Sequence, residues 1–367
     1  MATIEGIKSE TETIERLVET LRELPDVDAQ DPILQTMRQG DRQIDAEIEF
    51  NTGGKSYVLL VEVKKSVYPR DAQQILWQLD RYVASIDASD RRKHVMLLLA
   101  AESISPGAKD ILKAEKCGYF DSGGSLFIPA RGAYVYIEKP PPKTLQKSIR
   151  SLFTGKRSQV AHALLNRRDE WFGVKELAKL AEVSPATASE TLSALERFEW
   201  VTARGQGPIK ERRVTDPGAL LNEWQKQTLA APRRQANRRF YVPASDPDAI
   251  ANHLAEICER LGLDYVLTEQ YAAQVYAPFL SSVGRVTCRM EPNSQVNEVY
   301  AELQARPVNE GANLVVIETR ARGEFLFRQR VDPFWLASPV QVYLDLLHSG
   351  GRGKEMAEHL RHERIGF

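Results

Sequence analysis

Two segments near the N-terminus have the polar and apolar pattern of neighbouring β-strands. Residues 44–50 carry acidic side chains at every second position, which puts Asp45, Glu47 and Glu49 on one face of a strand. Residues 58–64 are almost wholly apolar until Glu62 and Lys64, which also share a face. The glycine-containing turn between the two segments predicts a hairpin whose second strand is buried and ends in charge.

Further elements follow along the first third of the chain. Apolar residues recur at helical spacing over residues 7–24 and 71–86, so both stretches are predicted amphipathic helices. Residues 94–100 are expected as a buried strand, and residues 118–128 as strand, tight turn, strand. This alternation predicts an α/β domain over residues 1–140, ended by a stiff proline-rich break.

The middle of the chain has the pattern of a winged helix-turn-helix, expected over residues 150–218. A first helix leads to a short second helix, and Ser184 and Pro185 then suit the N-cap and first position of a third. Two short strand patterns around a glycine-rich tip, residues 205–208, predict the wing. This order resembles MarR-like regulators, and a protein-binding role remains open beside DNA binding.

The last part, residues 240–367, again mixes helical and strand patterns and is predicted to form an α/β domain. The expected fold class is therefore multidomain α/β. The 367 residues have a formal net charge of −1, so any nucleic-acid surface must be local. The chain shows no apolar stretch of transmembrane length, no secretory signal pattern and no cysteine framework, which predicts a cytoplasmic protein without a membrane partner.

The charged end of the first hairpin suggests chemistry. A carboxylate and an ammonium on a buried strand are costly unless they are paired or bound to a metal. Asp45 and Glu62, meeting across the hairpin, would offer hard oxygen ligands for Mg²⁺ or Mn²⁺. Lys64 beside them would orient a water or stabilise phosphoryl charge. A plain surface ion pair of Glu62 with Lys64 or Lys65 is the alternative reading.

These residues resemble the motif of the PD-(D/E)XK nuclease superfamily, which has a restriction-endonuclease-like fold. Asp45 matches its aspartate, and residues 62–64 match its Glu-x-Lys. Gln78 and Tyr82 look like the Gln-x-x-x-Tyr element of the RecB-like branch. The resemblance implies Asp45, Glu62, Lys64 and Gln78 as catalytic residues, with Asp45 and Glu62 as metal ligands.

A wider resemblance is to AbiEi-type antitoxins and transcriptional regulators of type IV toxin–antitoxin systems. It rests on residues 118–125, where Ser125 stands in place of an expected Asn, and on the helical pattern of residues 337–347. It implies a C-terminal domain related to minimal nucleotidyltransferases. Residues 266–270 lack the Gly-Ser and paired aspartates of those enzymes, so this domain is expected to be a degenerate version without transfer activity.

Two functions remain open from the sequence. The first is a Mg²⁺-dependent DNA endonuclease directed by the winged helix, and the second is a non-cleaving regulator or antitoxin. Double-stranded DNA is the expected partner in both, with self-association or a protein partner at the C-terminal domain. The expected DNA contacts come from the third helix and the wing: Thr187, Ser189, Arg204, Lys210, Arg212 and Arg213.

Overall fold

The computed structural model describes residues 4–34, 44–83, 94–130, 132–231 and 237–367, with side chains from residue 10 onward and without those of residues 80–83. The chain forms two compact units. The first is Met1–Ile149 with Arg197–Glu199, and the second is Arg150–Glu196 with Trp200–Phe367. The expected multidomain α/β class is confirmed. Within the described parts of the chain, no helix combines the length and apolar character needed to cross a bilayer.

The first unit contains one mixed sheet of eight strands, in the order β1-β3-β4-β5-β6-β7-β8 with β2 also paired to β3. The β4, β5 and β6 strands are parallel to one another, and the remaining pairs are antiparallel. The strands are β1 (Asp28–Ala29), β2 (Ile33–Leu34), β3 (Ala46–Thr52), β4 (Lys55–Val67), β5 (His94–Ile104), β6 (Gly118–Asp121), β7 (Leu126–Ala130) and β8 (Ala133–Ile137).

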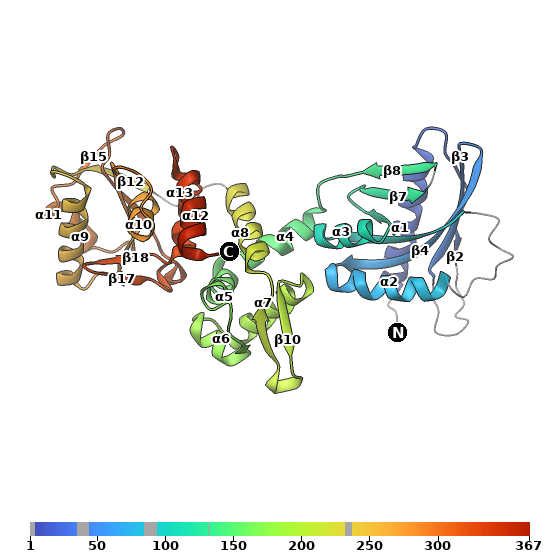
Figure 1. Cartoon of the computed structure of the whole chain (residues 1–367), viewed down its shortest axis with the longest axis horizontal. Coiled ribbons are helices and arrows are strands. Elements are labelled where there is room, and N and C mark those ends of the chain that lie inside the picture. The colour runs from blue at the N-terminus through green and yellow to red at the C-terminus, as the bar shows by residue number, and fades with distance from the viewer. Residues whose placement is uncertain (1–3, 35–43, 84–93, 131, 232–236) are drawn as a thin grey trace. The chain divides into compact units, whose positions relative to one another are not determined.

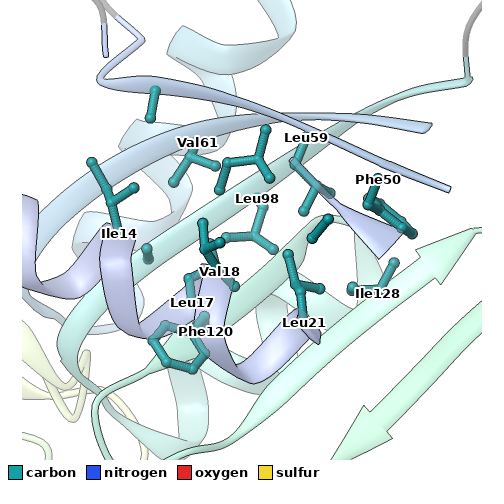
Figure 2. Close-up of a cluster of buried hydrophobic side chains, with 14 of the residues drawn as sticks. Ile14, Leu17, Val18, Leu21, Phe50, Leu59, Val61, Leu98, Phe120 and Ile128 are labelled. Carbon is teal, nitrogen blue, oxygen red and sulfur yellow. The ribbon is translucent and has the colours of Figure 1, made fainter. Parts of the chain in front are cut away.

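Helices pack on the sheet through two hydrophobic clusters, and a third, smaller cluster of the described residues joins Ile44, Val58 and Leu60. The α1 helix (Ile4–Arg22) packs its apolar stripe, from Ile14 to Leu21, on side chains such as Leu59, Val61 and Leu98 (Figure 2). The α2 helix (Pro69–Val83) and the α3 helix (Pro106–Ala114) share the other cluster. Because side chains alternate along β4, Tyr57, Leu59, Val61 and Val63 enter the α1 cluster, and Glu62 and Lys64 belong to the opposite face.

The second unit begins within α4 (Lys143–Leu152), and its residues 150–230, named the winged-helix part after the prediction, contain helices and short strands in the segment predicted as a winged helix-turn-helix (Figure 1). They are α5 (Gly155–Asn166), β9 (Phe172–Gly173), α6 (Val174–Leu180), α7 (Pro185–Arg197), β10 (Val201–Arg204), η2 (Gly207–Ile209), β11 (Glu211–Val214) and the following α8 (Pro217–Ala230). The three strands form an antiparallel sheet in the order β10-β11-β9. Ser184 Oγ accepts a hydrogen bond from Thr187 N (3.1 Å), which supports the expected start of α7.

The remaining residues form a seven-stranded mixed sheet in the order β15-β12-β16-β14-β13-β18-β17, with helices packed around it. The strands are β12 (Asn237–Tyr241), β13 (Tyr265–Thr268), β14 (Val286–Met290), β15 (Arg306–Pro307), β16 (Leu314–Glu318), β17 (Gln329–Val331) and β18 (Phe334–Leu336). The helices are α9 (Pro247–Leu261), α10 (Glu269–Tyr276), α11 (Val296–Glu302), η3 (Arg322–Phe325), α12 (Pro339–Leu346), α13 (Gly353–Leu360) and η4 (Arg361–Ile365).

Side chains of the winged-helix part and the C-terminal sheet domain interlock within the second unit. Ser338 is the N-cap residue of α12, and its Oγ lies 2.6 Å from Nε2 of His162 on α5. Both side chains are buried. Arg361 donates to Asn222 Oδ1 of α8 (2.7 Å). The sequence boundaries at residues 218 and 240 therefore fall inside one compact unit of the structure.

Candidate functional site

Asp45 lies at the start of β3, directly across from the polar end of β4. The pairing of Ala46 with Val61 sets this register, and Asp45 N donates to Val61 O (2.9 Å). The Asp45 carboxylate turns back onto β4, where Oδ2 accepts a hydrogen bond from Val63 N (2.6 Å). The hairpin therefore fixes this carboxylate next to the backbone that links Glu62 and Lys64.

Glu62 and Lys64 form a direct ion pair through Glu62 Oε1. The Glu62 side chain is 9% exposed and that of Lys64 40%, so the carboxylate is enclosed and the ammonium reaches solvent. Burial raises the pKa of Glu62 above its ordinary value, the Lys64 interactions oppose the rise, and the nearby Asp45 and Glu10 charges add to it. Glu62 Oε2 is buried and has no hydrogen-bond partner among the described residues.

Glu10 of α1 is a neighbour of this site that the sequence reasoning missed. Its charge is close enough to contribute to the raised pKa of Glu62. Glu10 is exposed, as are Glu15 and Glu19 further along the same helix, but of these three only Glu10 is among the charges that raise the pKa of Glu62. A signal was present in the sequence: Glu10 lies one helical turn before Ile14, which begins the buried stripe of α1.

No described contact joins Gln78 to the carboxylates and the lysine. Gln78 lies on an exposed part of α2, and none of the described contacts links it to Asp45, Glu62 or Lys64. The Tyr82 side chain falls outside the described residues. The structure thus brings together Asp45, Glu62 and Lys64 from two strands but gives Gln78 no place in their contacts.

The fit of a divalent cation can be assessed from the oxygen atoms present. No group of three or more His, Cys, Asp or Glu side chains suited to a metal occurs in the described part of the chain. Asp45 and Glu62 provide two carboxylates, and Glu62 Oε2 is an enclosed oxygen lacking a partner. Hard oxygen donors of this kind suit Mg²⁺, which needs few protein ligands because it keeps several waters.

The wing does not present all the cations expected to touch DNA. Arg212 is only 6% exposed, and its Nε lies 3.5 Å from Glu196 Oε2. Lys210 Nζ donates to both oxygens of the same carboxylate, at 2.9 and 3.0 Å. The expectation of a phosphate contact from Arg212 is therefore corrected: its charge lies inside the winged-helix part, where it balances the nearly buried Glu196.

Two other wing arginines gather around an aromatic side chain. The guanidinium carbons of Arg204 and Arg213 lie 4.3 and 5.0 Å from the ring centre of Trp171, a cation–π arrangement. Both arginines are exposed, and Arg204 also forms an ion pair with Glu211 (2.7 Å). Thr187 and Ser189 are half-exposed on α7. Arg213 is thus the predicted wing contact that best suits binding to a phosphate, because it is exposed and no described ion pair holds its charge.

The C-terminal domain places Glu269 inside the fold. Glu269 is 1% exposed, and its Oε2 accepts a hydrogen bond from Thr287 Oγ1 (3.1 Å) and lies 3.4 Å from Arg285. These contacts give the carboxylate a structural role between α10 and β14. The expectation that this position lacks transferase chemistry stays a prediction.

Comparisons with known proteins add little to this description. No family model and no curated protein matches the chain. One solved structure, titled "Possible transcriptional regulator from Methanosarcina mazei Go1", is 16% identical and is matched over 27% of this chain and 88% of its own, with a TM-score of 0.19. A likeness this weak carries no information on function, so the proposed function rests on the chain's own residues.

Proposed function

We propose that the chain is a Mg²⁺- or Mn²⁺-dependent DNA endonuclease whose winged-helix part holds the substrate. The observation that carries the proposal is the enclosed Glu62 oxygen without a partner, beside Asp45 and within reach of Lys64. A buried carboxylate oxygen left without a hydrogen bond is expensive. A cation bound between Asp45 and Glu62 would satisfy it and would offset the repulsion between the carboxylates.

The residues divide the chemistry in a simple way. Asp45, Glu62 and the Val63 carbonyl would hold the cation, which supplies Lewis-acid polarisation of the scissile phosphate. Lys64, half-exposed at the edge of the site, would orient the attacking water and stabilise the charge that develops on the phosphate. Glu10 would add a third negative charge near Glu62, which a bound cation would offset.

DNA binding is assigned to the winged-helix part. The half-exposed Thr187 and Ser189 of α7 offer hydroxyl groups to base edges or phosphates. Arg213 and Arg204, held against Trp171, offer guanidinium groups to the backbone. With a formal net charge of −1, the chain has no global attraction to DNA, so these local groups must supply it.

The proposal is tested by incubating the purified protein with supercoiled plasmid in Mg²⁺, Mn²⁺ or EDTA. We expect nicked or linear product only with metal. A titration of Mg²⁺ against thermal unfolding gives a second readout, because a ligand that binds only the folded state raises stability by about 2.7 kcal/mol at 100 times its Kd. Glu62→Gln should reduce this gain, and Glu47→Gln, on the same face of β3, should not.

A non-cleaving regulator of the AbiEi type is the second candidate. The observation that favours it is the direct Glu62–Lys64 ion pair, which neutralises both groups without any metal. The absence of described contacts from Gln78 to this pair points the same way. DNA binding without cleavage in either metal, and without metal-dependent stabilisation, would establish this candidate over the nuclease.

A further inference from the structure

A cleft of about 370 Å³ lies inside the second unit, between the winged-helix part and the C-terminal domain. Helices α5 and α8 form one side, and residues 320–324 with α12 form the other. Its volume is within the range of small-molecule sites, roughly 300 to 1,000 Å³. Its lining includes Lys156, Gln159, Trp224, Arg320 and Arg322.

Gln159 is the first sign that this cleft is built for a ligand. Its side chain lines the cleft and is 4% exposed, yet Nε2 has no hydrogen-bond partner among the described residues. Gly323 closes tightly over it, since a Cβ added there would lie 2.7 Å from Nε2. Leaving a buried donor unpaired costs on the order of 1 to 3 kcal/mol, which an acceptor atom in the cleft would recover.

Positive charge is the second sign. Lys156, Arg320 and Arg322 line the cleft, and neither arginine has an ion-pair partner among the described residues. The one acidic residue in this lining, Glu324, is held by Arg289. The α5 helix also begins here, and the side chain of its N-cap residue Thr154 makes no capping hydrogen bond. A helix N-terminus and uncompensated cations together favour an anion.

The third sign is an aromatic wall. Trp224 lines the cleft, with Phe153 and His162 packed against it at ring-centre distances of 5.7 and 5.9 Å. Burial lowers the pKa of His162 to about 4, so the imidazole is neutral at physiological pH and adds no competing charge. A planar apolar group can therefore lie along Trp224 while its charged end faces the cations.

We propose that this cleft binds a small organic anion with an aromatic body and a carboxylate or phosphate group. The anionic group would lie toward Arg320, Arg322 and the start of α5, and an acceptor atom would meet Gln159 Nε2. The site contains none of the residues of the β3–β4 hairpin. It stands whether or not the chain cleaves DNA.

The test uses the full chain with two probes of equal shape, 1-naphthoate and its neutral amide, 1-naphthamide. Calorimetry should show the anion binding at least about tenfold more tightly than the amide, a ratio that equals about 1.4 kcal/mol. Tryptophan fluorescence should change on binding, and Trp224→Phe should abolish that change. Equal affinity of the two probes, or no binding of naphthoate at millimolar concentration, would overturn the proposal.

Variants locate the site. The double variant Arg320→Ala with Arg322→Ala should weaken naphthoate about tenfold or more and leave the amide unchanged, while Arg306→Ala, an exposed arginine of the same domain outside the cleft, should change neither. Gln159→Leu should keep or raise the melting temperature, because it removes an unpaired buried donor, and still weaken naphthoate several-fold. Wild-type affinity in both cleft variants would show that the anion binds elsewhere.

Discussion

Glu62 is the residue on which the chemistry proposed for the first unit depends. An enclosed carboxylate is stable in its ionised form only when cations or donors surround it, and the described partner of this one is Lys64. Asp45 is better supplied, because its Oδ2 accepts the Val63 amide. The two carboxylates therefore differ. The hairpin backbone holds Asp45 by a hydrogen bond, whereas burial of the ionised Glu62 costs free energy that a bound cation would recover.

The first prediction follows from the raised pKa of Glu62. The folded protein holds this proton more tightly than the unfolded chain does, so stability falls as pH rises from the ordinary glutamate pKa through the raised value. In EDTA at pH 8, Glu62→Gln should increase the free energy of unfolding by roughly 1 kcal/mol. Urea unfolding at pH 8 and pH 4 measures it, and the gain should vanish at pH 4. A gain of equal size at both pH values would contradict this account.

The second prediction separates two adjacent wing arginines. Arg212 is buried against Glu196, so Arg212→Ala should lower stability by about 1 to 3 kcal/mol, moderated by the Lys210 contact that remains. Arg213 is exposed and contacts the Trp171 ring, so Arg213→Ala should lower stability by at most about 1 kcal/mol and lower the salt slope of DNA binding by about one unit. Urea unfolding and fluorescence anisotropy across a salt series measure the two effects. If Arg212→Ala instead lowered the salt slope and left stability unchanged, Arg212 would lie on the DNA surface.

How far the sequence predicts these residues depends on the range of the interaction. Strand periodicity places Glu62 and Lys64 on one face, and hairpin register brings Asp45 to them. Both are local rules. The position of Arg212 is harder to predict, because groups from distant elements decide whether its side chain is buried or exposed. Arg212 has the pattern of an exposed wing cation, and only the position of Glu196 on α7 explains its burial.

At the scale of elements, the turn between β6 and β7 shows what the sequence motif of residues 118–125 does. Lys109 of α3 reaches Asp121 Oδ2 (2.7 Å) and Ser125 Oγ (2.8 Å), and all three side chains are buried. Ser125 N donates to Asp121 Oδ1 (3.2 Å), and Gly124 takes a φ of +89°, which glycine allows without strain. The motif that supported the AbiEi resemblance has, in this chain, a structural explanation.

The third prediction compares two ion pairs on α3. Lys109→Met leaves the Asp121 charge buried without its partner and should cost about 3 to 5 kcal/mol. Lys113→Met removes the exposed pair with Asp110 from the same helix and should cost at most about 1 kcal/mol. Chemical denaturation of both variants measures the two losses of stability. Similar small losses in both would mean that the buried pair does not hold the turn to the helix.

At the scale of the whole molecule, each of the two compact units is expected to fold by itself. The sequence placed one boundary between residues 140 and 150, close to the division of the structure, but it also expected a separate winged helix. Helical and strand patterns do not reveal that buried His162 and Trp224 pack at the junction of the winged-helix part with the C-terminal domain. Contacts of this kind join residues more than one hundred positions apart.

The fourth prediction concerns fragments of the chain. Residues 1–152 and 153–367 should each unfold cooperatively, whereas residues 153–230 should be markedly less stable than 153–367, because Trp224 and His162 lose their cover. Circular dichroism during urea unfolding measures all three. Equal unfolding midpoints for residues 153–230 and 153–367 would contradict the conclusion that the second unit is one compact body.

Self-association through the C-terminal domain is a further prediction, and light scattering of residues 153–367 tests it.

The central claim is that Asp45, Glu62 and Lys64 form a metal-dependent site for DNA cleavage. The most direct measurement is single-turnover cleavage of a labelled duplex in Mn²⁺, with DNA binding measured by anisotropy on the same preparations. We expect Lys64→Met to lower the cleavage rate by about 100-fold or more, since an electrostatic group acting in the transition state is removed. Its DNA affinity should stay within about twofold of wild type, and Glu47→Gln should match wild type in both. Wild-type protein that binds the duplex but never cuts it, or a Lys64→Met variant that cuts as fast, would contradict the account.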